Sequence, residues 1–252
     1  MLKERREQIN SIIQSRGEIR LAELAELFPQ VSTMTLRRDL EALEQEGELI
    51  RTRGGAASLH RLTLLKEAAY RQRQLENTEA KLAIAARATA LIRPGTSLYI
   101  DSGTTCMIFA HALDVPNLVV LTPAPNIAIE LAAKPGIRVH LTGGQLNPDT
   151  LTLSGAPADE YIDALNVDTA VMAASAFSLT SGFTCGDYQE ARLKRRVIQK
   201  ARRVIVLMDS SKLDSQLPFT FARFEDIDIL VTEVSLPRDL RKQAEAAGVE
   251  LP

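Results

Sequence analysis

Residues suited to binding an anion follow a short apolar run at positions 97–100. The loop is Asp101-Ser102-Gly103-Thr104-Thr105, and a helical pattern begins within it. Its glycine, its three hydroxyls and the unpaired N–H groups of the first helical turn suit a phosphate, because the positive end of the helix dipole points toward the ligand. Asp101 would repel such an anion, so we expect its carboxylate to accept hydrogen bonds from sugar hydroxyls or from the loop backbone. For this loop alone, a polar turn without a ligand is the alternative.

Two further loops of similar composition also follow apolar runs. Thr142-Gly143-Gly144-Gln145 would allow a ligand to approach the backbone closely, or would simply form a tight turn. Asp209-Ser210-Ser211-Lys212 offers a hydroxyl at Ser211 and a positive charge at Lys212 for the same anion. Each loop is a modest indication by itself, whereas several such loops at one edge of a sheet predict a pocket.

Thr184, Glu190 and Lys194 form a fourth group near the start of a predicted helix. Glu190 and Lys194 are four residues apart, so their side chains share a helix face and can pair with each other. An exposed basic face that joins Lys194 to three neighbouring arginines is the alternative. The sequence thus predicts a ligand site that comprises Asp101, Ser102, Gly103, Thr104, Thr105, Gly143, Gly144, Thr184, Glu190, Lys194, Asp209, Ser211 and Lys212.

The elements that must position these loops alternate between strand and helix. After a helix over 78–91, the apolar runs predict strands at 97–100, 118–121, 138–142, 169–174, 204–208 and 227–231, and helices at 104–113, 126–133, 190–202 and 237–247. Alternation of this kind, with apolar strands, indicates an α/β domain with a mainly parallel sheet. Because ligands bind at the carboxyl ends of such strands, the four loops are expected to lie together.

A second group of residues, near the N-terminus, is suited to contact DNA. A helix over residues 33–46, capped by Ser32 or Thr33, would carry Leu36, Leu40 and Leu43 on one buried face. Met34 and Arg38 lie roughly opposite that face, and Arg37 lies to one side. Side chains near the N-terminus of such a helix reach base edges when the helix enters a major groove.

The flanking segments predict a winged helix-turn-helix. Helices at 3–15 and 21–28 precede the helix just described, and residues 48–59 contain two short runs around Gly54-Gly55 that predict a β-hairpin. A three-helix packing module with solvated arginines, or one that only contacts protein, is the alternative. The candidate DNA-binding residues are Ser32, Thr33, Met34, Thr35, Arg37, Arg38, Arg51 and Arg53, the last two in the wing.

Composition restricts the function classes. The chain has 252 residues and a net charge of −2, and residues 1–61 contain ten basic and ten acidic side chains. A neutral N-terminal region argues against a non-specific nucleic-acid binder, so we expect specific binding by a dimer that doubles the phosphate contacts. Cys106 and Cys185 match no metal or redox spacing, and we expect neither a metal nor a cofactor. Without a long apolar run or a secretion signal, the chain is expected to be cytoplasmic.

The ordered pattern Val31-Ser32-x-x-Thr35-Leu36-Arg37-Arg38-Asp39-Leu40, with Gly47, Arg51 and Gly54-Gly55-Ala56 after it, resembles the N-terminal signature of the DeoR family of bacterial transcriptional regulators. The loops at 101–105, 141–144, 182–184, 190–194 and 209–212 resemble the sensor domain of the same family. Arg53 stands where the family usually has histidine. Residues 122–126 and 172–176 also depart from the family pattern, which leaves the identity of the effector open.

The character of the chain changes near residue 62, and we interpret residues 62–78 as a linker with helical content between domains at 1–61 and 79–252. The resemblance implies a sensor similar in fold to ribose-5-phosphate isomerase. It implies a repressor of carbohydrate-metabolism genes that binds double-stranded operator DNA, associates with the nucleoid, responds to a phosphorylated sugar or related metabolite, and forms a homodimer or homotetramer. The alternative is a sugar-phosphate isomerase with Glu190 or Asp101 as its base, but the fused DNA-binding module favours a regulator that is not an enzyme.

Overall fold

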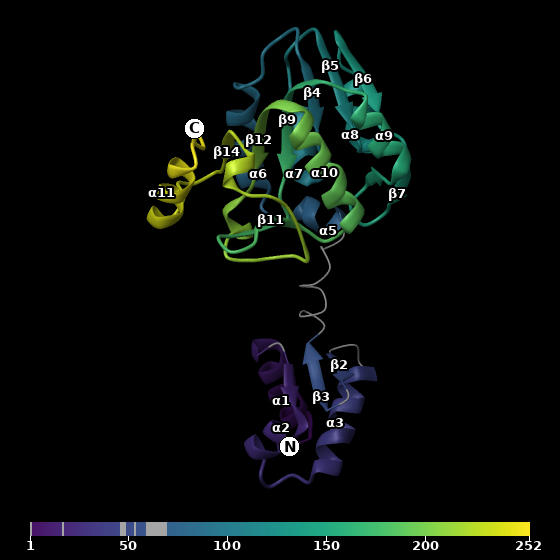
Figure 1. The fold of residues 1–252 in the computed structure, drawn as a ribbon. Coiled ribbons are helices and arrows are strands. Elements are labelled where there is room, and N and C mark those ends of the chain that lie inside the picture. Colours follow the sequence, from purple (N-terminus) through teal and green to yellow (C-terminus); the bar gives the residue numbers. More distant parts are fainter. Residues whose placement is uncertain (1, 17, 46–48, 53, 59–69) are drawn as a thin grey trace. The chain divides into compact units, whose positions relative to one another are not determined.

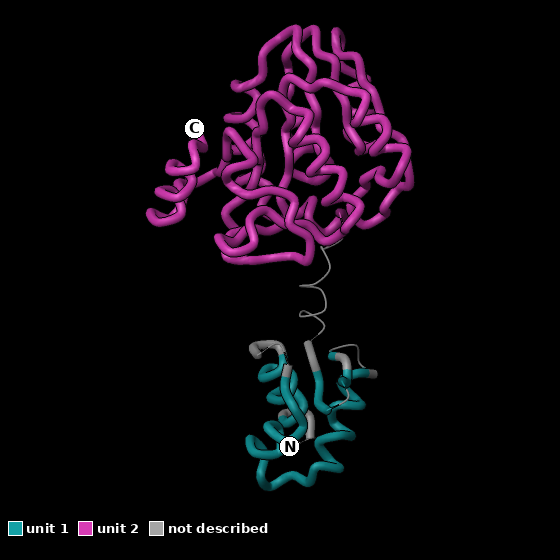
Figure 2. Tube along the Cα trace, viewed as in Figure 1, with its two compact units in different colours: residues 1–66 teal, residues 67–252 magenta. Residues whose placement is uncertain are grey.

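The computed structural model of the protein describes residues 2–16, 18–45, 49–52, 54–58 and 70–252. The chain divides into two compact units, residues 1–66 and 67–252 (Figure 2). The boundary falls inside the segment 62–78 that the sequence predicts as a linker, and residues 62–69 of that segment lie outside the described residues.

The first unit has the winged helix-turn-helix architecture predicted from the sequence (Figure 1). Its strands form an antiparallel sheet in the order β1-β3-β2. Gly55 lets β3 approach β1, because a Cβ at this position would lie 2.0 Å from the carbonyl oxygen of Ile19. The elements are α1 (Leu2–Arg16), β1 (Glu18–Arg20), α2 (Leu21–Leu27), α3 (Thr33–Gln45), β2 (Leu49–Thr52) and β3 (Gly55–Ser58).

The second unit is built on a six-stranded sheet in the order β14-β12-β9-β4-β5-β6. Every pair in this sheet is parallel, as predicted. The strands are β4 (Ser97–Ile100), β5 (Leu118–Thr122), β6 (Ile137–Leu141), β9 (Val167–Ala173), β12 (Ala201–Leu207) and β14 (Ile229–Val231).

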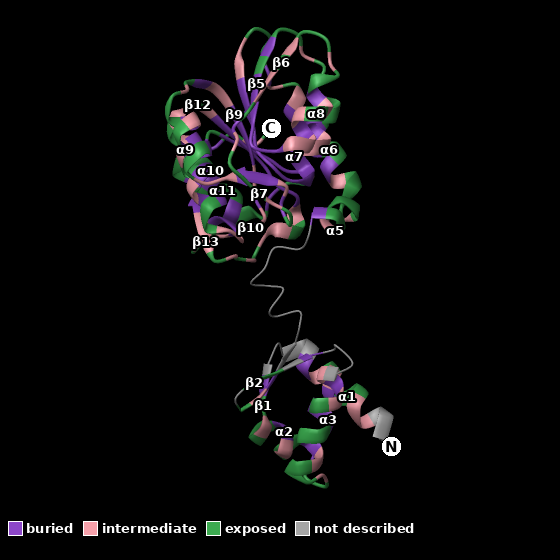
Figure 3. Cartoon of the chain, turned by 90° about the vertical axis from the view of Figure 1, so that its right-hand side faces the viewer, coloured by how far each residue is buried: buried purple, intermediate pink, exposed green. Residues whose placement is uncertain are grey.

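Helices cover both faces of this sheet, which explains why its strands are apolar throughout. Leu98 and Ile100 pack on the face covered by α6, α7 and α8, whereas Tyr99 between them packs on the face of α9 and α10 (Figure 3). These helices, with α11 near the C-terminus, are α6 (Thr78–Thr89), α7 (Thr104–Ala112), α8 (Pro125–Ala132), α9 (Ala156–Asp163), α10 (Tyr188–Lys200) and α11 (Arg238–Ala246).

Several short elements of the second unit were not predicted. The hairpin β7–β8 and the helix α9 lie between β6 and β9, and a three-stranded antiparallel sheet β10-β11-β13 packs its phenylalanines beside α10. The short helix α5 (Tyr70–Leu75) precedes α6. The remaining bounds are β7 (Gln145–Asn147), β8 (Thr152–Ser154), β10 (Ala176–Ser178), β11 (Gly182–Cys185), β13 (Phe219–Ala222), and the 3-10 turns Ser210–Lys212 and Phe224–Asp226.

The order of the strands indicates where a ligand would bind. From β4 the chain adds β5 and β6 on one side, and then returns to add β9, β12 and β14 on the other. The carboxyl ends of β4 and β9 therefore flank the point where the strand order reverses, which is the usual ligand position in open α/β sheets. Within the described part of the chain, every helix is too short or too polar to cross a membrane.

Candidate functional site

A polar pocket lies where β4 and β9 end. Its walls come from the loop after β4 (Ser102, Gly103, Thr104 and Thr105), from the residues that end and follow β9, and from α10 and the loop after β12. The sequence-predicted residues that line it are Ser102, Gly103, Thr104, Thr105, Glu190, Lys194, Asp209 and Lys212.

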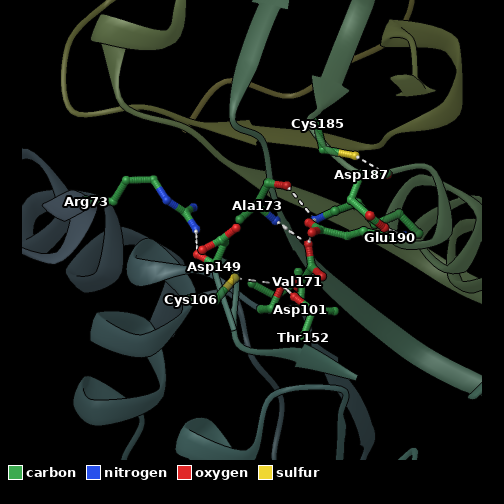
Figure 4. A network of polar contacts seen from close by, with 12 residues as sticks. Arg73, Asp101, Cys106, Asp149, Thr152, Val171, Ala173, Cys185, Asp187 and Glu190 are labelled. Atoms are coloured by element: carbon green, nitrogen blue, oxygen red, sulfur yellow. Dashed lines mark hydrogen bonds and ion pairs between the residues drawn. The ribbon is translucent and has the colours of Figure 1, made fainter. Parts of the chain in front are cut away.

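A buried ion-pair cluster forms one side of the pocket (Figure 4). The Lys194 ammonium donates to Asp101 Oδ2, lies 3.2 Å from Glu190 Oε1, and donates to the carbonyl oxygen of Ala173 at 3.1 Å. Asp101 Oδ2 also accepts the N–H of Ala173 at 3.0 Å. Burial alone would lower the pKa of Lys194, but the carboxylates of Asp101 and Glu190 outweigh burial and raise that pKa above its ordinary value.

This cluster settles two alternatives left open by the sequence. Lys194 pairs with Glu190 and is buried, so it does not belong to an exposed basic face. Asp101 lies behind the pocket wall and binds Lys194 and the backbone of the neighbouring strand β9, instead of its own loop. Its negative charge is therefore compensated inside the protein.

Arg73, Lys81 and Lys212 add further cations to the lining of the pocket. Lys81 is buried, and its ammonium donates to the carbonyl oxygens of Arg73 and Glu76. Burial lowers the pKa of Lys81, and the positive charges of Lys212 and Arg73 act in the same direction, while Asp209 opposes them. Among the described residues Lys81 and Lys212 form no ion pair within 4 Å. An anion in the pocket would supply the missing counter-charge.

Hydroxyls and helix α7 complete the pocket. Gly103 precedes the first turn of α7, and no side chain caps that turn. The hydroxyl of Ser102 accepts a hydrogen bond from Thr152 at 2.6 Å, which leaves its own proton for a ligand. Thr150 is buried in the pocket wall, and its hydroxyl has no partner among the described residues. The pocket thus combines unpaired N–H donors, hydroxyls and cations, which is the set that binds a phosphate ester.

Five predicted ligand residues do not line this pocket, namely Asp101, described above, and four others. Gly143 and Gly144 form the turn that leads to β7, where a Cβ on Gly144 would lie 2.4 Å from the carbonyl oxygen of Ser154. Thr184 is buried and accepts a hydrogen bond from the N–H of Leu217 at 2.9 Å. Ser211 does not line the pocket, but its hydroxyl donates a hydrogen bond to the carboxylate of Asp209, which does. The structure gives these residues roles in packing and in positioning.

Sequence reasoning missed Arg73, Lys81 and Thr150 as pocket residues. Arg73 and Lys81 precede the first strand of the sheet, so the rule that looks at loops after strands does not reach them. A lysine on the apolar face of α6, beside Ile84 and Ala85, was the available signal. Thr150 lies in the turn between two three-residue strands that the sequence did not predict.

The DNA-binding candidates lie on and around α3. Leu36, Leu40 and Leu43 are buried as predicted, and the side chains of Met34, Arg37 and Arg38 are exposed. Ser32 caps the helix, because its hydroxyl accepts the N–H of Thr35 at 3.2 Å and bonds to the Thr35 hydroxyl at 2.9 Å. Thr33 is the first residue of α3 and is exposed.

Asp39 fixes the orientation of α3, a role that sequence reasoning missed. It is buried and accepts hydrogen bonds from Arg5 Nε at 2.7 Å and Arg6 Nε at 3.1 Å, both on α1. The helix that carries the exposed arginines is therefore tied to α1 by two charge-assisted bonds.

The wing arginine Arg51 pairs with two glutamates of α3. Its Nε lies 2.7 Å from Glu44 Oε2, and its Nη2 lies 3.7 Å from Glu41 Oε1, both on α3. Because the Arg51 side chain remains 42% exposed, this pair ties the wing to α3 and competes with a phosphate contact. The second predicted wing residue, Arg53, lies outside the described residues.

The cysteines and the potential metal ligands are further groups that could form a site. Cys106 and Cys185 are free and buried, and no cluster of three or more His, Cys, Asp or Glu side chains in the described part of the chain is placed to hold a metal ion.

Two family profiles match the chain. A DeoR-like helix-turn-helix domain matches residues 5–61, and a DeoR C terminal sensor domain matches residues 76–234. Together they cover both compact units, and the second match alone covers more than half of the chain.

Similar proteins are transcriptional regulators. The HTH-type transcriptional regulator GlpR of Haloferax volcanii is 35% identical over 86% of this chain and 85% of its own length. The putative aga operon transcriptional repressor of Escherichia coli O157:H7 is 31% identical over 98% and 92%. The transcriptional repressor GlcR of Bacillus subtilis is 35% identical over 81% and 78%. These relatives are regulators and not enzymes, so the isomerase alternative is not supported.

Solved structures with a partial likeness include ribose 5-phosphate isomerase A of Methanocaldococcus jannaschii and eIF2B beta of Chaetomium thermophilum. The first has a TM-score of 0.40 and 19% identity over 55% of each chain. The second has a TM-score of 0.45 and 15% identity over 68% of this chain and 57% of that chain.

Proposed function

The chain belongs to the DeoR family of transcriptional regulators, and from this premise we propose that it represses genes of carbohydrate metabolism under the control of a phosphorylated sugar or a related metabolite. The pocket at the ends of β4 and β9 is the proposed effector site. The observation that carries this proposal is that Lys81 and Lys212 line the same pocket as Thr104 and Thr105 in the uncapped first turn of α7. Two of the relatives are named as transcriptional repressors, which supports repression as the mode of regulation.

In the proposed complex, the phosphate accepts hydrogen bonds from the N–H groups of the first turn of α7 and from Thr104 and Thr105. Lys81 and Lys212 supply the counter-charge. The polyol part of the effector would donate hydroxyl hydrogens to the carboxylate of Glu190 and bond to Thr150, both in the pocket wall. A hydroxyl acceptor at Glu190, together with the cations Lys81 and Lys212, would distinguish a phosphorylated sugar from a simple dianion.

At the first unit, we propose that Met34, Arg37 and Arg38 contact base edges or phosphates from α3, together with Thr33 at the start of the helix. Arg53 is proposed as a further DNA contact. A homodimer or homotetramer would present two such helices to half-sites of an operator. Effector binding would then change how the segment between the two units holds the DNA-binding domains, which alters operator affinity without touching a base contact.

The proposed effector class can be tested by thermal unfolding of the full-length protein. Ribose 5-phosphate or fructose 6-phosphate is expected to raise the midpoint of the sensor-unit transition, because a ligand that binds only the folded state stabilises it. Ribose and fructose serve as unphosphorylated controls. Lys212→Gln is expected to reduce the shift, and Lys242→Gln on the exposed face of α11 is the matched control. A panel of phosphorylated sugars that leaves the wild-type midpoint unchanged would refute the proposal.

A further inference from the structure

Helix α5 is the first described element of the second unit, and in the sequence it follows directly the segment that leaves the wing strand β3. It is only six residues long, and four of those residues are exposed. Tyr70 and Arg73, one helical turn apart, are the residues of α5 that turn toward the rest of the unit. Contacts of these two residues, and of the turn that follows α5, hold the helix in place.

Tyr70 anchors the start of α5. Its N–H donates to the carbonyl oxygen of Asp149 at 2.8 Å, and its buried hydroxyl accepts from Asn126 Nδ2 at 2.8 Å. Burial raises the pKa of Tyr70, so this phenol is neutral at physiological pH. Thr150, the residue next to Asp149, lines the pocket.

Pocket residues hold the other end of α5. The Lys81 ammonium donates to the backbone carbonyl oxygens of Arg73 and Glu76. Asn77, in the left-handed region at φ 49°, donates from Nδ2 to Asp209 Oδ1 at 3.2 Å and to the Ser211 hydroxyl at 2.9 Å. The helix and the turn after it are thus bound to the groups that would meet the effector.

Arg73 itself lines the pocket, together with Lys81 and Lys212. One of its hydrogen bonds, from Nη2 to the carbonyl oxygen of Asp149, is 3.4 Å long, near the limit for such a bond. A guanidinium carries five donors in a planar fork that matches the oxygens of a phosphate. Arg73 precedes the match to the sensor-domain profile, which begins at residue 76.

We propose that Arg73 is an effector-binding residue, and that its guanidinium contacts the anionic group of the bound metabolite. The inference rests on the proposed function, since it requires an anionic effector in this pocket. Its consequence is that the effector binds α5 as well as the sheet. Occupation of the pocket then holds α5 more firmly against the sheet. Because α5 directly follows the segment that leads from the DNA-binding domain, effector binding acts on the end of that segment.

The first test measures affinity by calorimetry on the full-length protein, with whichever of ribose 5-phosphate and fructose 6-phosphate raises the wild-type midpoint more. Arg73→Gln is expected to weaken binding by about 10- to 100-fold, the effect of losing a charge-assisted hydrogen bond. Arg71→Gln removes the same charge from an exposed position of the same helix and is expected to bind as the wild type does. Wild-type affinity in Arg73→Gln would overturn the inference.

The second test follows hydrogen exchange of the full-length protein with and without saturating ligand. Ligand is expected to slow exchange at residues 70–76 and at 102–107 in the wild type, but only at 102–107 in Arg73→Gln. Equal slowing at 70–76 in both proteins would overturn the inference. If Lys212→Gln weakens binding while Arg73→Gln does not, the inference fails and the proposed function stands; if neither sugar phosphate binds the wild type, both fail.

Discussion

Replacing Lys194 by methionine is expected to destabilise the second unit strongly. Methionine keeps the length of the side chain but removes the charge that lies between Asp101 and Glu190, both less than 6% exposed. Removing one partner of a buried ion pair costs about 3–5 kcal/mol, because the remaining charge stays buried without compensation. For a unit of this size, that cost lowers the unfolding midpoint by roughly 6–20 °C.

The effect of pH gives this prediction a definite sign. In the wild type the folded-state pKa of Lys194 is raised above its ordinary value of 10.5, so the contribution of the ion pair is complete below pH 10.5 and is lost only as pH rises through that higher folded-state value. In Lys194→Met two carboxylates remain buried together, which raises the folded-state pKa of one of them. The variant therefore loses stability as pH rises above about 4, the ordinary carboxyl value. The difference from wild type is expected to be larger at pH 8 than at pH 5.

Differential scanning calorimetry of the full-length chain at these two pH values measures both effects. The transition of the first unit serves as an internal reference, and Lys242→Met is the matched surface control. A Lys194→Met midpoint close to wild type at pH 8, or a difference that shrinks as pH rises, would refute the electrostatic reasoning.

Three further predictions concern single residues. Arg38→Ala is expected to weaken binding of a selected DNA duplex by about tenfold or more with no change in melting, and unchanged anisotropy titrations would show that Arg38 does not contact DNA. Asp39→Asn is expected to lower the midpoint of the first unit, because Arg5 and Arg6 lose their carboxylate partner; an unchanged midpoint would show that these bonds do not hold α3. Gly144→Ala is expected to lower the midpoint of the second unit, because its Cβ would lie 2.4 Å from a backbone oxygen at φ 109°, yet to bind effector as tightly as wild type. If Gly144→Ala instead binds effector more weakly and keeps the wild-type midpoint, Gly144 belongs to the effector site.

Much of the fold could be predicted because its main elements carry strong local signals. The strands of the large sheet are apolar runs that end at polar loops, and α3 has its leucines at helical spacing, so the predicted bounds lie within three residues of those observed. The strands β7, β8 and β10 have three residues each, too few to show a period, and only their tertiary partners make them strands. The helix α9 begins directly after Gly155 with a proline in its first turn, which in the sequence is typical of a loop as well.

The candidate site could be predicted mainly for residues in loops that follow strands of the sheet. Loops after β4 and β12 converge because parallel strands end at the same edge, which the sequence pattern implies. Arg73 and Lys81 reach the pocket from helices that precede the sheet, and no local pattern encodes that approach. The pairing of Lys194 with Asp101 spans 93 residues and depends on α10 packing against β9.

Control of DNA binding by an anionic metabolite in the sensor pocket can be tested directly. The most direct measurement is fluorescence anisotropy of a duplex that the full-length protein selects from a random pool, titrated with and without a saturating sugar phosphate of demonstrated binding. The account predicts a change in DNA affinity of about 5- to 150-fold. Identical DNA affinity in the presence and absence of the bound sugar phosphate would contradict it.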